Sequence, residues 1–291
     1  MQLMAVGFFI LILTGALLLM LPVSARDGTV TPFLTALFTS ASASCVTGLI
    51  LVDTYTHWSF FGRLILLALI QIGGLGFITM GMAVSLALRR KIGLKQRGWI
   101  KESFNVLDIG GVVRMLKLVL AGTVMFEGIG ALLLFVRFYP RMGFLRGLYY
   151  SIFHAVSAFC NAGFDLMGYY EPYSSFTAYY DDPLVSFTLC ALILIGGIGF
   201  FVWNDIAAHK WHFRRYALQT KMVLSSSVLL IFGGAVLFYV IEGNRLFADM
   251  NLTGKICSSF FCAVTPRTAG FNTTDTGALS EGGKLLTILL M

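Results

Sequence analysis

Long apolar stretches separated by short polar segments run through the whole chain of 291 residues. A helix needs about 20 mostly apolar residues to cross the hydrocarbon core of a membrane. Stretches of that length lie at residues 3–22, 58–88, 112–136, 184–203 and 222–241. A sixth begins near Leu285 and stops at Met291, too soon to span a bilayer, so we expect this last helix to be incomplete. The pattern predicts an all-α protein that crosses a membrane several times.

Three shorter apolar segments, each about 12 residues long, lie between the long ones at 33–44, 147–159 and 252–264. With a rise of 1.5 Å per residue, such a helix crosses only about half of the hydrocarbon core. We expect each segment to enter the membrane and to return on the same side through an extended stretch. Extended backbone at that depth leaves N–H and C=O groups unpaired unless it lines a wet cavity. These stretches are therefore predicted to line a pore.

The extended stretches repeat one pattern, in which a phenylalanine precedes a glycine by ten positions. The copies start at Phe38, Phe153 and Phe260 and reach Gly48, Gly163 and Gly270. A second motif, Ile-Gly-Gly-Leu-Gly-Phe at 72–77, recurs as Ile-Gly-Gly-Ile-Gly-Phe at 195–200. A period of more than one hundred residues indicates a duplicated module. We expect three helix, pore-loop, helix modules joined by cytoplasmic linkers: repeat 1 at 1–90, a linker at 91–111, repeat 2 at 112–209, a linker at 210–221, and a truncated repeat 3 at 222–291.

Composition supports membrane insertion, because 57% of the residues are hydrophobic and only 12% are charged, against about 25% charged in soluble domains. The net charge of +7 comes mainly from two basic clusters. Their members are Arg89, Arg90, Lys91, Lys95, Arg97 and Lys101, and Lys210, Arg214, Arg215 and Lys221. The positive-inside rule places both in the cytoplasm and the acidic segment 165–182 outside. A nucleic-acid partner is disfavoured because the clusters contain few aromatic side chains, Trp99 and Trp211.

The glycine pattern suits a cation filter, because backbone carbonyls aimed at an axis can replace the water shell of an ion. Glycine reaches positive φ without steric cost, and the preceding short helices would direct their partially negative C-terminal ends at the pore. A single glycine is better explained by close helix packing, but three copies in register favour a pore. For the second motif, packing or flexing remains the preferred explanation. The predicted potassium-binding filter comprises Val46, Thr47, Gly48 and Leu49; Asn161, Ala162, Gly163 and Phe164; and Thr268, Ala269, Gly270 and Phe271.

Glu127 is the carboxylate deepest in an apolar run, and such residues are costly in lipid and often functional. It could bind a cation or carry a proton, but we favour a buried hydrogen-bonded acid or a pair with Arg137 or Arg114. Arg267 could tune ion entry or pair with Asp275.

Other polar residues receive simpler interpretations. His154 is predicted to be a hydrogen-bonded anchor, Arg63 to extend outward, and Asn204 and Asp205 to lie in the membrane interface. The cysteines, at positions 45, 160, 190, 257 and 262, are predicted to be small buried hydrophobes, without a metal or disulfide framework.

The motifs resemble those of the Trk/Ktr/HKT superfamily of potassium transporters. Ser44 to Leu49 with Gln71 to Phe77 is similar to the first filter and following helix of that family, and the segments 157–164 and 265–272 are similar to its second and third filters. The resemblance implies four repeats around a pseudo-fourfold pore that conducts potassium, sometimes sodium, into the cell. A fourth filter has no counterpart here, so the chain alone is expected not to conduct. Its start at the first repeat resembles the Ktr branch.

The resemblance also implies the surroundings of the protein. We expect a multi-pass protein of the bacterial plasma membrane, in contact with membrane lipid, and a homodimer in which each subunit has its own pore. A cytosolic nucleotide-binding regulatory subunit would dock on the basic loops. No cofactor is expected besides the transported potassium, and no enzymatic activity.

Three alternatives remain open. A proton- or sodium-coupled symporter would use discontinuous helices, and a membrane-embedded transferase would use Glu127, His154 or Asp205. The transferase is disfavoured because its polar groups are scattered along the chain. Residues 1–22, followed by Val23-Ser24-Ala25, could also be a signal peptide, although the segment lacks a basic start.

Overall fold

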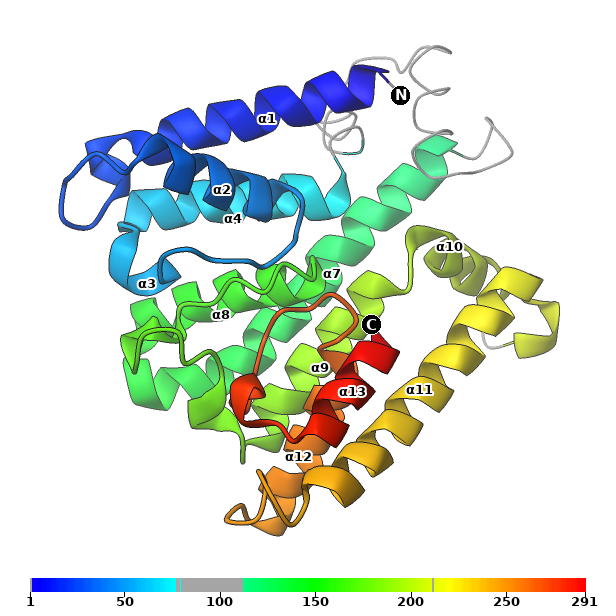
Figure 1. The fold of residues 1–291 in the computed structure, drawn as a ribbon. Helices are drawn as coiled ribbons and strands as arrows, with labels where there is room; N and C mark the ends of the chain where they lie inside the picture. The colour runs from blue at the N-terminus through cyan, green and yellow to red at the C-terminus, as the bar shows by residue number, and fades with distance from the viewer. Residues whose placement is uncertain (1, 77–78, 80–111, 211) are drawn as a thin grey trace.

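The computed structural model describes residues 2–76, 79, 112–210 and 212–291 of the chain (Figure 1). They form helices and turns without a β-strand, apart from an isolated bridge between Ala25 and Trp58. The main helices are α1 (Gln2–Met20), α2 (Phe33–Ser44), α4 (Phe60–Leu75), α7 (Val112–Met142), α8 (Phe144–Phe159), α9 (Pro183–Gly197), α10 (Phe200–His209), α11 (Leu218–Glu242), α12 (Leu252–Val264) and α13 (Glu281–Leu290). The predicted all-α class is confirmed.

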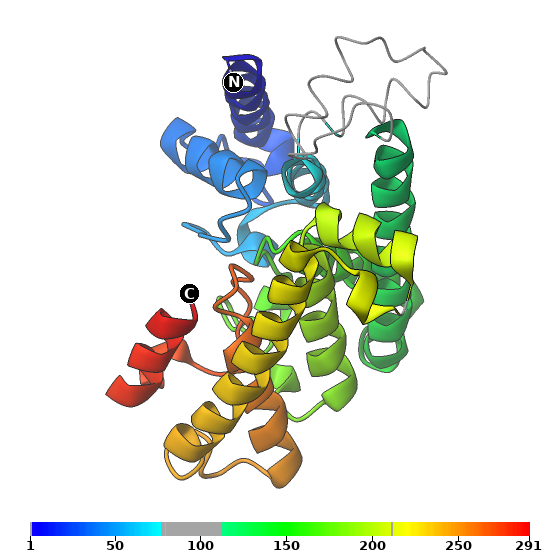
Figure 2. The same cartoon turned by 90° about the vertical axis from the view of Figure 1, so that its right-hand side faces the viewer.

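The helices form three groups in chain order, each built around a half-length helix. In the first group α2 packs against α1 and α4, in the second α8 packs against α7 and α9, and in the third α12 packs against α11 and α13. Contacts of α4 with α8 and of α9 with α12 join neighbouring groups. Figure 2 shows the first group at the top, the second at the right and the third at the lower left, around a common middle.

The half-length helices agree closely with the sequence predictions. α2 and α12 have the bounds predicted for them, whereas α8 begins at Phe144, three residues before the predicted start. Among the described residues, two helices are long and apolar enough to cross a membrane on their own, the part of α7 from Met115 to Met142 and the whole of α11. Large exposed apolar side chains, including Val124 of α7 and Leu229 and Val240 of α11, give these surfaces the character of a lipid-facing belt.

The span predicted at 184–203 is not one straight helix. It is divided into α9 and α10, which meet at an angle of 92°. The break follows from Gly199, whose φ of 90° lies outside the range of a right-handed helix. The corresponding Gly76, with φ of 83°, ends α4 in the same way. Residues 77–78 and 80–88 of the predicted span 58–88, and the basic linker 91–111, lie outside the described residues.

Close packing explains the other glycines of the second motif, as predicted. A Cβ on Gly73 would lie 2.2 Å from the carbonyl oxygen of Ser44, and one on Gly196 would lie 1.8 Å from that of Phe159. Ser44 and Phe159 are the last residues of α2 and α8. The motif therefore lets the second long helix of a repeat touch the carboxyl end of the half-length helix.

Four of the five cysteines are buried, and all five are free thiols. Cys45 is an exception to the predicted burial, because it is exposed at the end of α2. It follows the last residue of that helix and begins the first loop, in which residues 46–50 are half-buried or exposed.

Candidate functional site

The loops that follow α2, α8 and α12 converge at one place in the middle of the molecule. A Cβ on Gly48 would lie 2.9 Å from the carbonyl oxygen of Ala162, and one on Gly163 would lie 2.9 Å from the Cα of Gly270. A Cβ on Gly270 would in turn lie 3.8 Å from the Cα of Gly48. The three glycines that sequence analysis placed in register are thus neighbours in space, although they are more than one hundred positions apart along the chain.

Each loop has the same unusual backbone conformation. The glycines have φ of 74°, 70° and 76°, and the residues two positions earlier, Val46, Asn161 and Thr268, have φ of 57°, 56° and 62°. Left-handed φ is disfavoured for any side chain and rare for a β-branched one such as valine or threonine. Strain of this kind persists only where surrounding contacts fix it, and it is concentrated at functional sites.

A hydroxyl group at the end of each half-length helix fixes its loop. Ser42 Oγ donates to the carbonyl oxygen of Leu49 at 2.7 Å, and Ser157 Oγ donates to that of Phe164 at 2.6 Å. In the third repeat, Thr265 Oγ1 donates to the oxygen of Phe271 at 2.5 Å. The backbone carbonyls of the same hydroxyl residues accept hydrogen bonds from the N–H groups of Thr47, Ala162 and Ala269. Each loop is therefore closed onto its own helix at two points.

These hydroxyl anchors divide the predicted filter residues into two classes. The carbonyls of Leu49, Phe164 and Phe271 are hydrogen-bonded back to their own helices. The residues before them carry the left-handed backbone and the close approach between loops. Sequence analysis missed the anchors, although the aligned copies place Ser42 and Ser157 at the same position and Thr265 one residue later.

The three half-length helices end directly before the converging loops, at Ser44, Phe159 and Val264. The C-terminal end of a helix carries a partial negative charge from its unpaired carbonyls. Three such ends next to one centre favour a cation there over an anion, and none of them adds a full negative charge that would hold the ion tightly.

Glu127 of α7 supports the second loop from behind. Its Oε1 accepts a hydrogen bond of 3.0 Å from Gln71 of α4, and Gln71 Oε1 is 4.0 Å from the thiol of Cys160, the residue that directly follows α8. The predicted hydrogen-bonded acid is confirmed, whereas the pair with Arg137 is wrong, because Arg137 binds Asp182 at 3.1 Å. The side chain of Arg114 lies outside the described residues.

Two substitutions of Glu127 distinguish the contribution of its hydrogen bond to stability from the contribution of its charge. Glutamine keeps an acceptor oxygen for Gln71, so we expect Glu127→Gln to leave thermal stability nearly unchanged. Glu127→Leu leaves the Gln71 amide unpaired, which costs about 1–3 kcal/mol. Thermal melting of the purified variants measures the difference. A leucine variant as stable as the parent would show that the hydrogen bond contributes nothing to the fold.

Arg267 lies immediately before the left-handed Thr268 but does not pair with Asp275 as proposed from the sequence. Its guanidinium donates to Ser227 of α11, to Oγ at 2.9 Å and to the carbonyl oxygen at 3.3 Å. Asp275 instead accepts a hydrogen bond from the N–H of Gly277 in the following turn. Arg267 thus holds the third loop against the long helix of its own repeat.

Asp53 fastens the first repeat to the second on the side where the loops leave the centre. Its carboxylate is 5% exposed and accepts from the N–H groups of Tyr55, Thr56 and Tyr173 at 3.0, 2.7 and 3.0 Å. Tyr173 belongs to the acidic loop of repeat 2. Sequence analysis had no reason to single out Asp53, since an aspartate before a short helix is an ordinary cap and gives no sign of a partner 120 positions away.

The remaining polar residues do not form a catalytic group among the residues that the structure describes. His154 acts as the predicted anchor, with Nδ1 2.8 Å from the carbonyl oxygen of Tyr150 and Nε2 accepting from the N–H of Leu166. Arg63 donates to the carbonyl oxygen of Trp58 and lies over the ring of Tyr55, so it does not extend freely outward. Glu127, His154 and Asp205 each have separate partners. Their separation gives the transferase alternative no site in this part of the chain.

Comparisons with known proteins agree with this arrangement. Residues 3–291 match the family described as "TrkH: Cation transport protein". The chain is 41% identical to the "Potassium/sodium uptake protein NtpJ" of Enterococcus hirae, over 100% of this chain and 63% of that protein. It is 40% identical to the "Ktr system potassium uptake protein B" of Bacillus subtilis, over 100% of this chain and 64% of that protein. The chain thus spans slightly less than two thirds of these curated relatives.

A solved structure shares the fold. The potassium transporter TrkH from Vibrio parahaemolyticus superimposes with a TM-score of 0.64 at 16% sequence identity, covering 98% of this chain and 55% of that one. The agreement extends over nearly all of the helices described above.

Proposed function

Because this chain belongs to the TrkH family of cation transport proteins, we propose that it takes part in potassium uptake across the bacterial plasma membrane. The observation that carries the proposal is the convergence of three loops with one left-handed backbone pattern beside three helix C-terminal ends. Such loops present carbonyl oxygens to a desolvated cation without adding a fixed charge. The activity is transport, and no covalent chemistry is required of the site.

We assign the potassium-binding carbonyls to the first three residues of each predicted group and an anchoring role to the fourth. The binding set is then Val46, Thr47 and Gly48; Asn161, Ala162 and Gly163; and Thr268, Ala269 and Gly270. The anchoring set is Leu49, Phe164 and Phe271, because their carbonyl oxygens already accept hydrogen bonds from the hydroxyl anchors. The repeat boundaries proposed from the sequence place one such group in each repeat.

Gly48→Ser tests the filter assignment. A serine at φ of 74°, with its Cβ 2.9 Å from the carbonyl oxygen of Ala162, shifts the first loop and the oxygens that replace the water shell. We expect a lower preference for potassium over sodium. Uptake of both ions is measured in cells without their own potassium transporters, with the chain alone and as a chimera that adds the part of the B. subtilis relative it does not match.

The control for this experiment is Gly28→Ser, at a glycine that also has positive φ, 71°, but has open space around it. This control carries the same backbone strain outside the three loops. Unchanged ion preference in Gly48→Ser, with normal uptake, would remove the filter assignment.

We propose that the protein works as a homodimer with a cytosolic regulatory subunit. Support comes from the relatives whose names describe a "Ktr system", and from the exposed cations of the segment 210–221.

Sodium coupling is the second candidate function, because one relative is named for both potassium and sodium. Uptake that follows an imposed sodium gradient at constant voltage would favour coupling, whereas uptake that follows voltage and potassium alone would favour a simple pore.

A further inference from the structure

An apolar cavity of about 500 Å³ lies between α7, α9 and α10, and none of the residues that line it belongs to the predicted filter. Its walls include Leu118, Gly122 and Phe126 of α7, Ile195 of α9, and Trp203 and Ile206 of α10. The volume falls in the range of about 300–1,000 Å³ that is usual for ligand sites. Met125, also at its edge, is 51% exposed, so the cavity opens on the outside of the helix bundle. In a membrane protein, an opening of this kind at an apolar surface is accessible to lipid.

The 92° bend between α9 and α10 orients one wall of this cavity. If α9 crosses the membrane, α10 lies along its surface. Trp203, Ile206 and Ala207 face the cavity at helical spacing, and Lys210, with φ of 50°, directly follows the end of the helix. The indole N–H of Trp203 donates to the carbonyl oxygen of Ile195 at 3.0 Å, which fixes the ring over the cavity. The apolar wall that α10 contributes is therefore followed directly along the chain by a cation.

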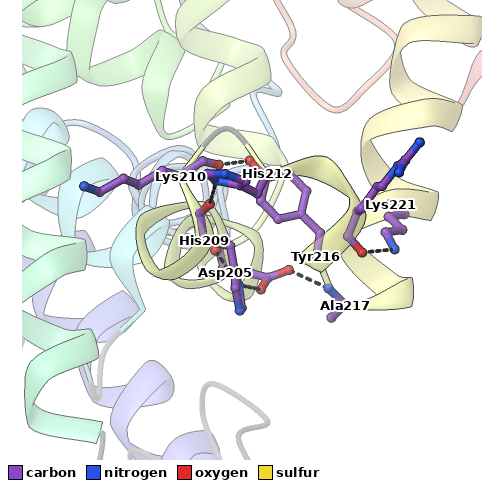
Figure 3. A network of polar contacts seen from close by, with 8 residues as sticks. Asp205, His209, Lys210, His212, Tyr216, Ala217 and Lys221 are labelled. Atoms are coloured by element: carbon purple, nitrogen blue, oxygen red, sulfur yellow. Dashed lines mark hydrogen bonds and ion pairs between the residues drawn. The ribbon is translucent and has the colours of Figure 1, made fainter.

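Polar contacts hold this end of α10 rigidly against the start of α11 (Figure 3). Asp205 is only 8% exposed, because the turn covers its carboxylate, while Asn204 is exposed; the place of both residues in the membrane interface stays a prediction. One oxygen of Asp205 lies 2.8 Å from Nδ1 of His209, and the other accepts from the N–H of Ala217 at 2.9 Å. The hydroxyl of Tyr216 donates to the carbonyl oxygen of Lys210. Both oxygens of the Asp205 carboxylate therefore have polar partners within the turn.

The cations of this turn remain on the outside. Lys210, Arg214 and Arg215 are exposed, and in Figure 3 the side chain of Lys210 extends away from that of Lys221. Lys221 Nζ donates to the carbonyl oxygen of Arg214 at 2.8 Å. By the positive-inside rule this turn lies at the cytoplasmic surface, where anionic lipid headgroups attract Lys and Arg. The cavity is complementary to an apolar chain and the exposed cations are complementary to an anionic headgroup, so one amphipathic molecule matches both.

We propose that the cavity binds an acyl chain of an anionic phospholipid from the cytoplasmic leaflet, with the lipid phosphate held by Lys210, Arg214 and Arg215. The apolar walls accept the chain, and the bend at Gly199 turns α10 so that the cations lie at the level of the headgroup. The Asp205 contacts keep α10 in this orientation.

Titration of the delipidated 291-residue protein with phosphatidylglycerol or phosphatidylcholine, followed by native mass spectrometry, tests the proposal. We expect phosphatidylglycerol to bind more tightly than phosphatidylcholine. Arg214→Ala with Arg215→Ala should weaken phosphatidylglycerol binding about 30-fold, which corresponds to about 1 kcal/mol for each cation near the surface. Ala207→Trp or Met125→Trp should fill the cavity and reduce binding of both lipids, since either lipid inserts a chain.

Matched controls come from other parts of the chain. Arg245→Ala removes an exposed cation just beyond the opposite end of α11, and Val236→Trp fills a smaller apolar cavity, of about 270 Å³, between α11 and α12. Neither should change phosphatidylglycerol binding at the proposed site. Circular dichroism verifies that each variant remains folded.

Three results would overturn the proposal. The first is equal binding of the two lipids to the parent protein, and the second is unchanged lipid binding in both cavity-filling variants. The third is a cavity-filling variant that changes from dimer to monomer mass while it keeps its bound lipid. The last result would assign the cavity to a second copy of the chain. Because the measurement is of lipid binding, its result is independent of potassium uptake.

Discussion

Replacing Gly196 with alanine is expected to be the most damaging single methyl addition among the glycines described. The new Cβ would lie 1.8 Å from the carbonyl oxygen of Phe159 and 2.9 Å from its carbonyl carbon. Both atoms are backbone at the end of α8, so they cannot rotate away as a side chain would. Overpacking in a well-packed core costs about 1–3 kcal/mol and sometimes more, and a clash with backbone belongs at the upper end. We expect a large loss of folded protein and a clearly lower melting temperature.

Gly233→Ala is the matched control for this substitution. Gly233 lies inside α11, and a Cβ there would meet nothing within 4 Å. Alanine is favoured over glycine in a helix by about 1 kcal/mol, so this variant should be as stable as the parent or slightly more stable. Size-exclusion profiles and melting curves compare the two. If Gly196→Ala melted like Gly233→Ala, the close contact between α9 and the end of α8 would be wrong.

Gly163→Ala is expected to abolish most potassium uptake while leaving much of the fold intact. Gly163 has φ of 70°, and its Cβ would lie 2.9 Å from both the carbonyl oxygen of Ala269 and the Cα of Gly270. A left-handed conformation costs about 1–2 kcal/mol for a residue with a side chain. The second loop relieves both the strained φ and the close contact by moving away from the third loop. Since about 1.4 kcal/mol corresponds to a factor of ten, we expect uptake to fall at least tenfold.

Gly128→Ala provides the comparison for uptake. Gly128 lies in α7, and a Cβ added there would meet nothing within 4 Å, so alanine should leave uptake unchanged. Both variants are measured in the uptake chimera, with membrane expression quantified for each. Parent-like uptake by a well-expressed Gly163→Ala would contradict the place of this glycine in the ion path.

The half-length helices were predictable because their lengths are set by local sequence. The residues of α2 and α12 form apolar runs bounded by polar or proline positions, such as Pro32 and Asn251, and the structure gives both helices the predicted bounds. The glycine pattern likewise identified three loops that meet in space. Three copies in one chain made these glycines recognisable, because glycines at the same position of each copy are expected to have the same structural role.

The contacts between distant residues were not predictable in the same way. For Glu127, sequence analysis predicted a hydrogen-bonded acid or a pair with an arginine, and for Arg267 it proposed Asp275, but it named no neutral partner for either residue. Glu127 instead binds Gln71, from the neighbouring repeat, and Arg267 binds Ser227 on a helix 40 positions earlier. Polar neutral partners leave no charge pattern in the sequence, so only the packing of the helices shows them.

The division of the predicted span at 184–203 was also missed, although the signal was present. Gly196 and Gly197 permit close packing, whereas Gly199 breaks the helix through its positive φ. A glycine in an apolar run has no side chain that distinguishes these two tasks. The distinction depends on the backbone of the neighbouring helix, which lies within 1.8 Å of the Cβ position at Gly196 and leaves open space at Gly199.

The hydroxyl anchors have a consequence for how the three loops can diverge. Because Ser42, Ser157 and Thr265 each fasten a loop to the helix that precedes it, much of the backbone path of each loop is fixed within its own repeat. Amino-acid changes at positions that do not touch a neighbouring loop can therefore accumulate in one copy. The different side chains that follow the same path, valine, asparagine and threonine at the left-handed position, illustrate this independence. Copies of a duplicated module that each contain their own hydroxyl anchor can thus diverge in sequence one at a time.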